Sequence, residues 1–289
     1  MRKYAGVVVL YQPKDDVWDN IQSYLEEIDL LYVMDNSLDV NSIVVEKIKQ
    51  NEKCSYFSMN GNKGLAVALN EGCHLAKKDG YDYILTMDQD SVFEKNAVNT
   101  MIAKIEQSKE HYTIIAPNVT SVYPNENGEM KTSYILLPKG EEKLETWVMT
   151  SGSLMNLSDY EEVGGFDESF FIAHIDVDLG IRMYQKGMKI LMLGDAMIYQ
   201  RFGNSKPKKL LWKTVHPWYE DSNRTYYLFR NQTYMLKKYG KEYKDIIHVS
   251  LSNHIIKILI FEDKKIEKIK KAIEGYRDGK RGKMGKYAG

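Results

Sequence analysis

Two carboxylates separated by one residue close an apolar run in the first half of the chain. Asp88 and Asp90 follow the run Tyr83–Met87, and alternate residues of an extended segment share one face. Two hard anionic oxygens on one face suit Mg²⁺ or Mn²⁺, which take substrate phosphates and water as their remaining ligands. A solvated acidic turn has the same sequence, so the pair indicates chemistry only together with other residues.

A second group of carboxylates lies in an aromatic and aliphatic stretch, residues 166–178. Desolvation in such surroundings raises the pKa of a carboxyl group, which suits Asp176 to general-base work. The alternative is that Asp176 caps the following helix and that Asp178 pairs with Arg182 one turn later. The catalytic and the structural interpretations are compatible if the Asp178–Arg182 pair is the scaffold and Asp176 is the base. We expect His174 to be exposed or hydrogen-bonded rather than a ligand.

Polar residues also follow two other apolar runs. Asp35 ends Leu30–Met34, where its carboxylate can accept the ring N–H of a uracil or thymine base, although a turn or cap role is favoured by the sequence alone. Asn62, Lys63 and Gly64 form a turn that opens a predicted helix. The turn matches neither a Walker loop nor G-x-G-x-x-G, but a helix N-terminus still favours an anion.

The elements that must position these residues are those of an α/β sheet. Short β-branched runs alternate with helical patterns through the first half of the chain, and a further strand is expected at Met188–Leu193. In an open parallel sheet, ligands bind outside the carboxyl ends of the strands. The pattern changes near Arg201, so we expect one α/β core over residues 1–200 and a helical extension over residues 201–289.

Composition excludes several classes of protein. The 289 residues are 43% hydrophobic and 28% charged, which is ordinary for a globular chain and excludes a disordered one. Forty Lys and Arg balance forty Asp and Glu, so the global positive field of a nucleic-acid binder is missing. No apolar run approaches the ~20 residues of a membrane span. Cys54 and Cys73 lack metal-binding spacing and are expected to be reduced thiols of a cytoplasmic protein.

Taken in order, the motifs resemble those of family-2 glycosyltransferases with the GT-A fold, and most of all the bacterial rhamnosyltransferase branch. The resemblance runs from Val7 to about Asn231. Its motifs are Val8-Val9-Leu10-Tyr11, Met34-Asp35-Asn36-Ser37, Asn62-Lys63-Gly64-Leu65, Asp88-Gln89-Asp90, Ser151-Gly152-Ser153, Val163-Gly164-Gly165-Phe166-Asp167, Asp176-Val177-Asp178 with Arg182, and Tyr226-Tyr227 with Arg230-Asn231. Each motif is weak alone, but the full set in this order is specific.

This resemblance implies a Rossmann-like, mixed and mostly parallel sheet flanked by helices, with a nucleotide-sugar half over residues 1–117 and an acceptor half over residues 118–200. It places Tyr11 and Asp35 against the base and assigns Asp88 to the ribose side and the metal. Asp90 is the more direct ligand of Mn²⁺ or Mg²⁺, and Asp176 is the catalytic base of a single in-line displacement that inverts the sugar.

One position departs from the family pattern. Many relatives carry a histidine after the last core strand, where this chain has Gln200, a poor metal ligand. Three arginines can hold the diphosphate instead, because guanidinium groups match phosphate oxygens: Arg201, Arg224 and Arg230. Alternatively the metal binds weakly, and Arg224 and Arg230 belong to an exposed basic helix face.

The acceptor side and the substrates are set by analogy. Residues expected to face the acceptor are Trp147, Ser151, Gly152, His174 and Asp178. We expect dTDP-rhamnose as the donor, with a UDP-sugar as the alternative, and a cell-surface or lipid-linked glycan as the acceptor. Nucleotidyl transfer and a non-catalytic scaffold are the competing functions. A homodimer is compatible with this branch.

The end of the chain is strongly basic. From Lys264 onward, ten Lys and Arg stand against three Asp and Glu. Apolar residues recur there at helical spacing, namely Ile266, Ile269, Ile273 and Tyr276. A basic amphipathic helix can lie on an anionic membrane surface, whereas the alternative is that the isoleucine stripe packs on the protein and the lysines are solvated.

Overall fold

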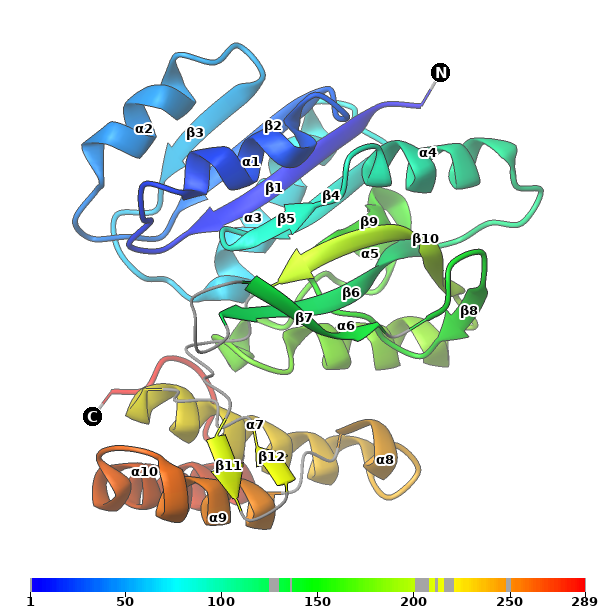
Figure 1. Cartoon of the computed structure of the whole chain (residues 1–289). Helices are drawn as coiled ribbons and strands as arrows, with labels where there is room; N and C mark the ends of the chain where they lie inside the picture. The colour runs from blue at the N-terminus through cyan, green and yellow to red at the C-terminus, as the bar shows by residue number, and fades with distance from the viewer. Residues whose placement is uncertain are drawn as a thin grey trace.

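The computed structural model describes residues 2–124, 130–135, 137–200, 208–210, 213–215, 221–247 and 251–288. Arg201, one of the predicted diphosphate ligands, lies outside the described residues. A mixed ten-stranded sheet forms the centre of the molecule, and four further helices lie together beyond one side of it (Figure 1).

The first half of the sheet is parallel, as the alternation of strands and helices predicts. Its order is β3-β2-β1-β4, and helices connect the strands. The elements are β1 (Tyr4–Leu10), α1 (Val17–Leu25), β2 (Leu30–Asp35), α2 (Ser42–Lys49), β3 (Cys54–Ser58), α3 (Leu65–Lys78) and β4 (Tyr83–Asp88). Every residue of β1 is buried, because helices cover both faces of this parallel sheet.

In the second half, strands of both directions continue the sheet in the order β4-β9-β6-β10-β5. The strand β9 is antiparallel to β4 and β6, so β6 and β10 run in the same direction as the first four strands. The elements are β5 (Ser91–Phe93), α4 (Ala97–Gln107), β6 (Ile114–Pro124), β7 (Met130–Ile135), β8 (Glu142–Glu145), β9 (Ser153–Asn156), α5 (Leu157–Glu162), the 3-10 turn η1 (Glu168–Phe170), α6 (Ile175–Gln185) and β10 (Ile190–Gln200).

The strand β10 is longer than the sequence indicates, because it passes through an irregularity between Leu193 and Met197 and continues to Gln200. That extension brings Gln200 to the same edge as Asp88, the last residue of β4. The short strands β5 and β8 were not expected, since three or four residues carry too little periodicity to be recognised.

Two apolar cores lie on opposite faces of the sheet. One contains buried residues of α1, α2 and α4, and the other contains those of α3, α5 and α6. The second core also includes Met235, Tyr243 and Ile247, which come from the C-terminal helices and the turn between two of them. The resulting helix–sheet–helix layering fixes the carboxyl ends of the parallel strands at one rim.

The C-terminal part consists of α7 (Ser222–Tyr239), α8 (Lys244–Ile247), α9 (Leu251–Phe261) and α10 (Lys265–Arg281), with the small strands β11 (Lys208–Leu210) and β12 (Lys213–Val215) before them. The helix α10 packs on α7 through its smallest residues. A Cβ at Gly275 or Gly279 would lie 2.3 Å from the carbonyl oxygen of Tyr226 or Arg230.

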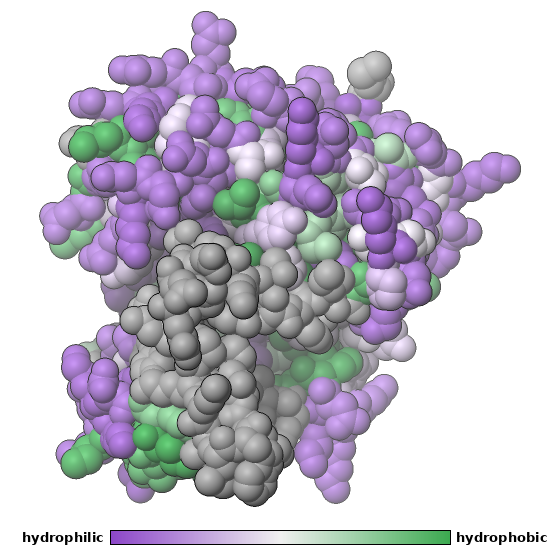
Figure 2. Space-filling model, viewed as in Figure 1, coloured by the Kyte–Doolittle hydropathy of each residue, from purple (hydrophilic) through white to green (hydrophobic). Residues whose placement is uncertain are grey.

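Three of the four residues of the isoleucine stripe lie on the outer face of α10, whereas Ile269 is partly buried, so the alternative in which the whole stripe packs on the protein is not observed. Ile266 is 75% exposed and Ile273 is 47% exposed, whereas the buried residues of α10 are Lys268, Ala272, Gly275, Asp278 and Gly279. Figure 2 shows apolar side chains on the surface in the lower part of the molecule, where these helices lie. No helix within the described ranges has both the length and the apolar character of a membrane span.

Candidate active site

The turn between Asp88 and Asp90 is fixed to the end of β1 by its middle residue. The Gln89 side chain accepts a hydrogen bond from the backbone N–H of Tyr11 at 2.9 Å and donates one to the Tyr11 carbonyl at 3.0 Å. Asn20 of α1 donates to the Gln89 carbonyl at 2.9 Å. These contacts explain how Tyr11, whose side chain is half-exposed, comes to lie beside the acidic turn. Gln89 gave no signal in the sequence analysis.

Asp88 lies among charged groups of its own turn and of two distant parts of the chain. The pKa of its carboxyl is raised to about 7, because burial and the neighbouring carboxylates Asp90 and Asp176 outweigh the lowering effect of Arg224. The Gln200 amide also lowers it by donating to Asp88 Oδ2 at 3.0 Å. Three other residues selected from the sequence therefore lie within electrostatic range of Asp88: Asp90, Asp176 and Arg224.

The donor set at this rim fits a hard divalent cation. Burial and the repulsion from Asp90 disfavour the charged Asp88, and a cation would reverse that effect. Within the part of the chain that the structure describes, no group of three or more His, Cys, Asp or Glu side chains forms a complete metal cage. Two carboxylates would leave the other coordination positions to water and phosphate oxygens, which is the usual arrangement for Mg²⁺.

Asp176 is the second residue of α6, close to the positive end of that helix. Burial raises the pKa of its carboxyl to about 6, although backbone N–H groups, including that of Thr150, offset part of the increase. Its Oδ1 accepts from Val177 N at 2.9 Å. The N-cap of the helix is His174 rather than Asp176, so the capping alternative is wrong. A carboxyl with this pKa is ionised near neutral pH and can still accept a proton.

Asp178 is a scaffold residue and does not face an acceptor. Its carboxylate is fully buried and accepts from Arg182 Nε at 2.8 Å, Lys238 Nζ at 2.7 Å and the Tyr239 hydroxyl at 2.6 Å. Arg182 in turn donates to the carbonyls of residues 163 and 165. The expected pair with Arg182 is present, whereas the assignment of Asp178 to the acceptor side is corrected, because its oxygens are used inside the protein.

Asp35 occupies a turn at the end of β2. Its Oδ1 accepts from Ser37 N and its Oδ2 from the Tyr56 hydroxyl, each at 2.9 Å, and the residue is fully buried. The turn role, which the sequence favoured, is therefore observed. The next residue, Asn36, accepts from Lys63 N at 2.8 Å and donates to the Gly64 carbonyl at 3.1 Å. The predicted base-binding strand end and the 62–64 turn are thus one connected unit.

The 62–64 turn also contacts the loop before α6. Gly64 has φ of +101°, and a Cβ there would lie 2.8 Å from the Phe171 ring. Leu65, at the start of α3, donates its N–H to the Phe171 carbonyl at 2.7 Å. From the far end of the chain, Lys286 Nζ donates to the Asn62 carbonyl at 3.0 Å. At the N-terminus of α3, the N–H of Leu65 is therefore hydrogen-bonded within the protein.

The structure describes two of the three arginines predicted to hold the diphosphate, and their environments differ. Arg224 lies near enough to Asp88 to lower the pKa of that carboxyl. Arg230 is 1% exposed, and its guanidinium donates to the carbonyls of residues 169, 170 and 285. The expectation that Arg230 holds a diphosphate is therefore corrected, and so is the alternative of an exposed helix face, because all of its contacts are internal.

The residues predicted to face the acceptor have different structural roles. Ser151 supports the acidic turn, since its hydroxyl accepts from Asp88 N at 3.1 Å and donates to Ser91 at 2.8 Å. At Gly152, φ is +87° and a Cβ would be 2.8 Å from Ile198 and Pro117. Trp147 packs against Gly180 of α6.

His174 differs from its expectation, because it is neither exposed nor fully hydrogen-bonded. It is 8% exposed, and its Nδ1 has no hydrogen-bond partner among the described residues. Burial lowers the pKa of the ring to about 4. The imidazole is therefore neutral at physiological pH and does not contribute a positive charge beside Asp176.

Comparison with known proteins gives the family and the fold. Residues 7–178 match the profile described as glycosyl transferase family 2. The chain is 25% identical over 300 residues to a dTDP-rhamnosyl transferase, RfbF, of Shigella flexneri, covering 97% of this chain and 96% of the relative. It is 23% identical over 293 residues to the low-salt glycan biosynthesis hexosyltransferase Agl10 of Haloferax volcanii, covering 97% and 92%.

Two solved structures share the fold at low sequence identity. A structure of GalNAc-T7 with UDP, GalNAc and Mn²⁺ has a TM-score of 0.60 at 14% identity, over 97% of this chain and 56% of that chain. A structure of Staphylococcus aureus TarS, residues 1–349, with UDP-GlcNAc has a TM-score of 0.59 at 15% identity, over 96% and 80%. The expected GT-A architecture, a mixed sheet with flanking helices, is confirmed.

Proposed function

Since the chain belongs to glycosyl transferase family 2, we propose that it transfers a sugar from a nucleoside diphosphate to an acceptor hydroxyl with inversion at the anomeric carbon. The observation that carries this proposal is the Asp176 carboxyl, with a pKa near 6, in the electrostatic neighbourhood of the acidic turn. A base opposite the leaving diphosphate is what a single displacement requires.

In the proposed reaction, Asp176 accepts the proton of the acceptor hydroxyl as its oxygen forms a bond to the anomeric carbon. The bond from that carbon to the diphosphate breaks in the same step, and the electron pair leaves with the nucleoside diphosphate. Arg224, which already lowers the pKa of Asp88, is placed to offset negative charge at the rim. The ion pair of the buried Asp178 with the partly exposed Arg182 holds the first turns of α6 and so orients Asp176.

Asp88 and Asp90 are the residues proposed to hold Mg²⁺ or Mn²⁺, which would stabilise the charge of the leaving diphosphate. Gln200 fixes one Asp88 oxygen by a hydrogen bond. Ser151 fixes the Asp88 backbone, and Gln89 fixes the turn to β1. The protein thereby presents both carboxylates from one rigid turn.

The donor that we favour is dTDP-rhamnose, with UDP-sugars as the alternative. Support comes from the similarity to a dTDP-rhamnosyl transferase over nearly the full length of both chains. The structurally similar TarS and GalNAc-T7 were solved with UDP-GlcNAc and with UDP, which supports the alternative. The proposed base site is the unit of Tyr11, Asp35 and the 62–64 turn.

The binding test uses the purified protein with dTDP, UDP, dTDP-rhamnose and UDP-GlcNAc, each with Mn²⁺, Mg²⁺ or EDTA. A ligand at a hundredfold excess over its dissociation constant stabilises the native state by about 2.7 kcal/mol. We expect a metal-dependent rise in Tm with dTDP compounds, absent in Asp90→Asn. Folded protein that gains no stability from any nucleotide would refute the proposal and favour a scaffold.

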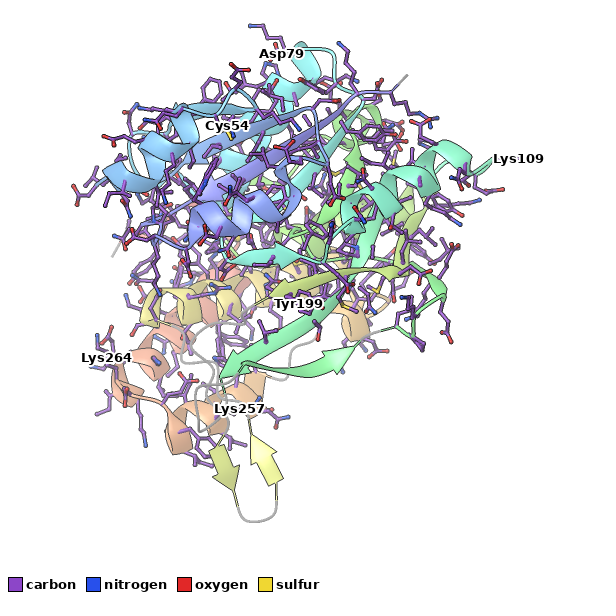
Figure 3. All side chains as sticks on the ribbon, turned by 45° about the horizontal axis from the view of Figure 1, so that its top comes forward. Cys54, Asp79, Lys109, Tyr199, Lys257 and Lys264 are labelled. Carbon is purple, nitrogen blue, oxygen red and sulfur yellow. The ribbon has the colours of Figure 1, made fainter. Side chains whose placement is uncertain are left out.

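We further propose that the acceptor is a cell-surface or lipid-linked glycan and that the enzyme works on the cytoplasmic membrane surface. The exposed apolar side chains of α9 and α10 support the membrane contact: Ile256, Leu259, Ile260, Ile266, Ile273 and Tyr276. Lysines accompany them, among them Lys257 of α9 and Lys264 before α10, which Figure 3 labels. Each Lys or Arg near an anionic surface contributes about 1 kcal/mol.

Flotation with liposomes tests that contact. Vesicles containing phosphatidylglycerol are expected to carry the protein upward, while neutral phosphatidylcholine vesicles are not. The double variant Ile266→Glu with Ile273→Glu should stay at the bottom. Ile43→Glu, on the distant helix α2 and also exposed at 58%, is the matched control and should float like the wild type. Equal flotation of all three proteins would refute the contact.

A further inference from the structure

The loop before the proposed base has an unusual backbone. Three of its residues, none of them glycine, have φ in the left-handed region: Phe171 at 65°, Ala173 at 65° and His174 at 61°. Side chains with a Cβ rarely adopt this region, and three cases within four residues are exceptional. We call residues 169–174 the base loop, since Asp176 lies two residues after its end.

The centre of the base loop is a γ-turn of the rare form with positive φ. Phe171 has φ of 65° and ψ of −56°, and the Ile172 N–H donates to the Phe170 carbonyl at 2.8 Å, which closes the turn over a single residue. Such conformations persist only where surrounding groups hold them. The loop therefore needs contacts from outside its own sequence.

Those contacts come from two adjacent buried side chains of α7. The Asn231 amide Nδ2 donates to the carbonyls of Phe170 at 3.3 Å, Ile172 at 2.7 Å and Ala173 at 2.9 Å. Arg230 Nη2 donates to the carbonyls of Ser169 at 3.3 Å and Phe170 at 2.8 Å. Two side chains thus bind four carbonyls of the base loop.

The two side chains also orient each other. Arg230 Nε donates to Asn231 Oδ1 at 2.8 Å, which directs the Asn231 amide nitrogen toward the loop. The guanidinium carbon lies 4.8 Å from the centroid of the Tyr227 ring, and that ring stacks on Phe171 at 5.0 Å. Arg230 and Asn231 are at most 1% exposed, so water does not compete for their hydrogen bonds.

The last residues of the chain complete the arrangement. Gly285 donates its N–H to the Ser169 carbonyl at 2.7 Å and accepts from Arg230 with its own carbonyl. Tyr287 N donates to the Tyr227 hydroxyl at 2.7 Å. The C-terminal segment therefore contacts both Arg230 and the first residue of the base loop.

We propose that Arg230 and Asn231 are positioning residues, which hold the base loop in its strained conformation and thereby place the Asp176 carboxylate. This inference rests on the proposed function of Asp176 as the base. Neither side chain contacts Asp176 in the described hydrogen bonds, and their donors are directed to loop carbonyls. The loop passes the constraint to α6, because the His174 carbonyl accepts from Asp178 N at 3.0 Å.

The same loop extends the constraint to the proposed donor site. The Phe171 carbonyl accepts from Leu65 N, and the Phe171 ring lies against Gly64. A change in the γ-turn would therefore move the 62–64 turn as well as Asp176. Through the base loop, Arg230 and Asn231 therefore set the distance between the proposed sugar-donor site and Asp176.

Hydrogen–deuterium exchange tests the clamp without any substrate. In the full-length protein, Asn231→Ala should increase exchange about tenfold in peptides covering residues 168–178, while β1 and β4 stay unchanged. Ala173→Gly added to Asn231→Ala should restore much of the protection, because glycine adopts positive φ without a steric penalty. The matched control, Ala103→Gly on α4, should not restore it. Wild-type exchange in Asn231→Ala would overturn the inference.

Kinetics tests whether the clamp positions the base. With dTDP-rhamnose as the probe and dTDP release as the readout, Asn231→Ala should lower kcat about 100-fold and change the KM for the donor little, since a small displacement of a catalytic group has that effect. Ala173→Gly should recover part of kcat in that background. If Ala173→Gly recovered none of the kcat lost in Asn231→Ala, the loss would indicate general destabilisation and overturn the proposal. Arg230→Lys, which keeps the charge but not the fork, serves if Asn231→Ala does not fold.

Two outcomes separate this inference from the proposed function. If Asp176→Asn is inactive and Asn231→Ala is fully active, the clamp is wrong and the proposed function stands. If Asp176→Asn turns over like the wild type, the proposed function is wrong, while the exchange experiment still decides whether Arg230 and Asn231 hold the loop.

Discussion

Gln200 and Asp88 join two strand ends that are 112 residues apart in the sequence, through a hydrogen bond of 3.0 Å from Nε2 to Oδ2. The other amide atom, Gln200 Oε1, is buried and has no partner among the described residues. A buried acceptor without a partner is costly, and a bound ligand is one way to satisfy it. We therefore propose that Gln200 belongs to the metal and diphosphate site, at the position where the resemblance implies a histidine.

Replacing Gln200 should weaken the binding of nucleotide and metal together. We expect Gln200→Leu to raise the dissociation constant for dTDP with Mn²⁺ about tenfold or more, because a hydrogen bond to a charged group contributes about 1.5–3 kcal/mol. Isothermal titration calorimetry measures the change. Gln107→Leu, at the exposed end of α4, should bind as the wild type does. Unchanged affinity in Gln200→Leu would remove Gln200 from the site.

The rate of transfer should increase with pH as Asp176 loses its proton. Because burial raises the pKa of Asp176 to about 6, the base is protonated and inactive below that value and active above it. We expect kcat/KM to rise with unit slope on a logarithmic scale below pH 6 and to level off above pH 7. A profile that is flat between pH 5 and 8 would contradict the assignment of the base.

Stability should show the opposite dependence on pH. The pKa of Asp176 is raised on folding, so the native state binds more protons than the unfolded state between about pH 4 and 6. Its contribution to the free energy of unfolding is therefore fully present below pH 4 and lost as pH rises through 6. Asp176→Asn should stabilise the protein at pH 8, by on the order of 2 kcal/mol, but not at pH 4.

Urea denaturation in EDTA at the two pH values measures this difference. Asp159→Asn, a carboxylate near the surface that pairs with His111, is a useful comparison because it lies outside the rim. If Asp176→Asn changed stability equally at both pH values, the raised pKa would not be the cause.

The parts of the site that the sequence predicted are those that follow from local pattern. Asp35 and Asp88 end apolar strands, and parallel strands bring their carboxyl ends to one rim, so the position of both was readable. The Asp178–Arg182 pair followed from helical spacing alone.

The parts that the sequence did not predict depend on contacts between distant segments. Arg230 was expected at a diphosphate, since a guanidinium suits phosphate oxygens, but the fold directs the same donors to backbone carbonyls 60 or so residues away. Gln200 is a poor metal ligand by its chemistry, and its contact with Asp88 depends on the extension of β10, which the sequence does not predict. Residue type limits what a side chain can bind, and tertiary structure selects the partner.

Removing the buried carboxylate of Asp178 should destabilise the protein strongly. Asp178→Ala leaves the partly exposed cations Arg182 and Lys238 without their shared, fully buried anion, and losing a hydrogen bond to a charged group costs about 1.5–3 kcal/mol. The matched comparison is Glu162→Ala, which breaks a surface pair with Lys186 and should cost under about 1 kcal/mol. Urea denaturation gives both values, and equal losses would show that burial does not strengthen the Asp178 cluster.

The contact between α10 and α7 should depend on the absence of a side chain at Gly275. A methyl group there would lie 2.3 Å from the Tyr226 carbonyl oxygen, a backbone atom that cannot rotate away. We expect Gly275→Ala to cost about 1–3 kcal/mol, because overpacking outweighs the gain in helix propensity. Lys270→Ala on the outer face of α10 is the control and should change stability little. The helix α10 leads to the segment that contacts Ser169. Hydrogen–deuterium exchange in the base loop should therefore increase in Gly275→Ala but not in Lys270→Ala. A stable Gly275→Ala protein with an unchanged loop would show that α10 can shift without disturbing the site.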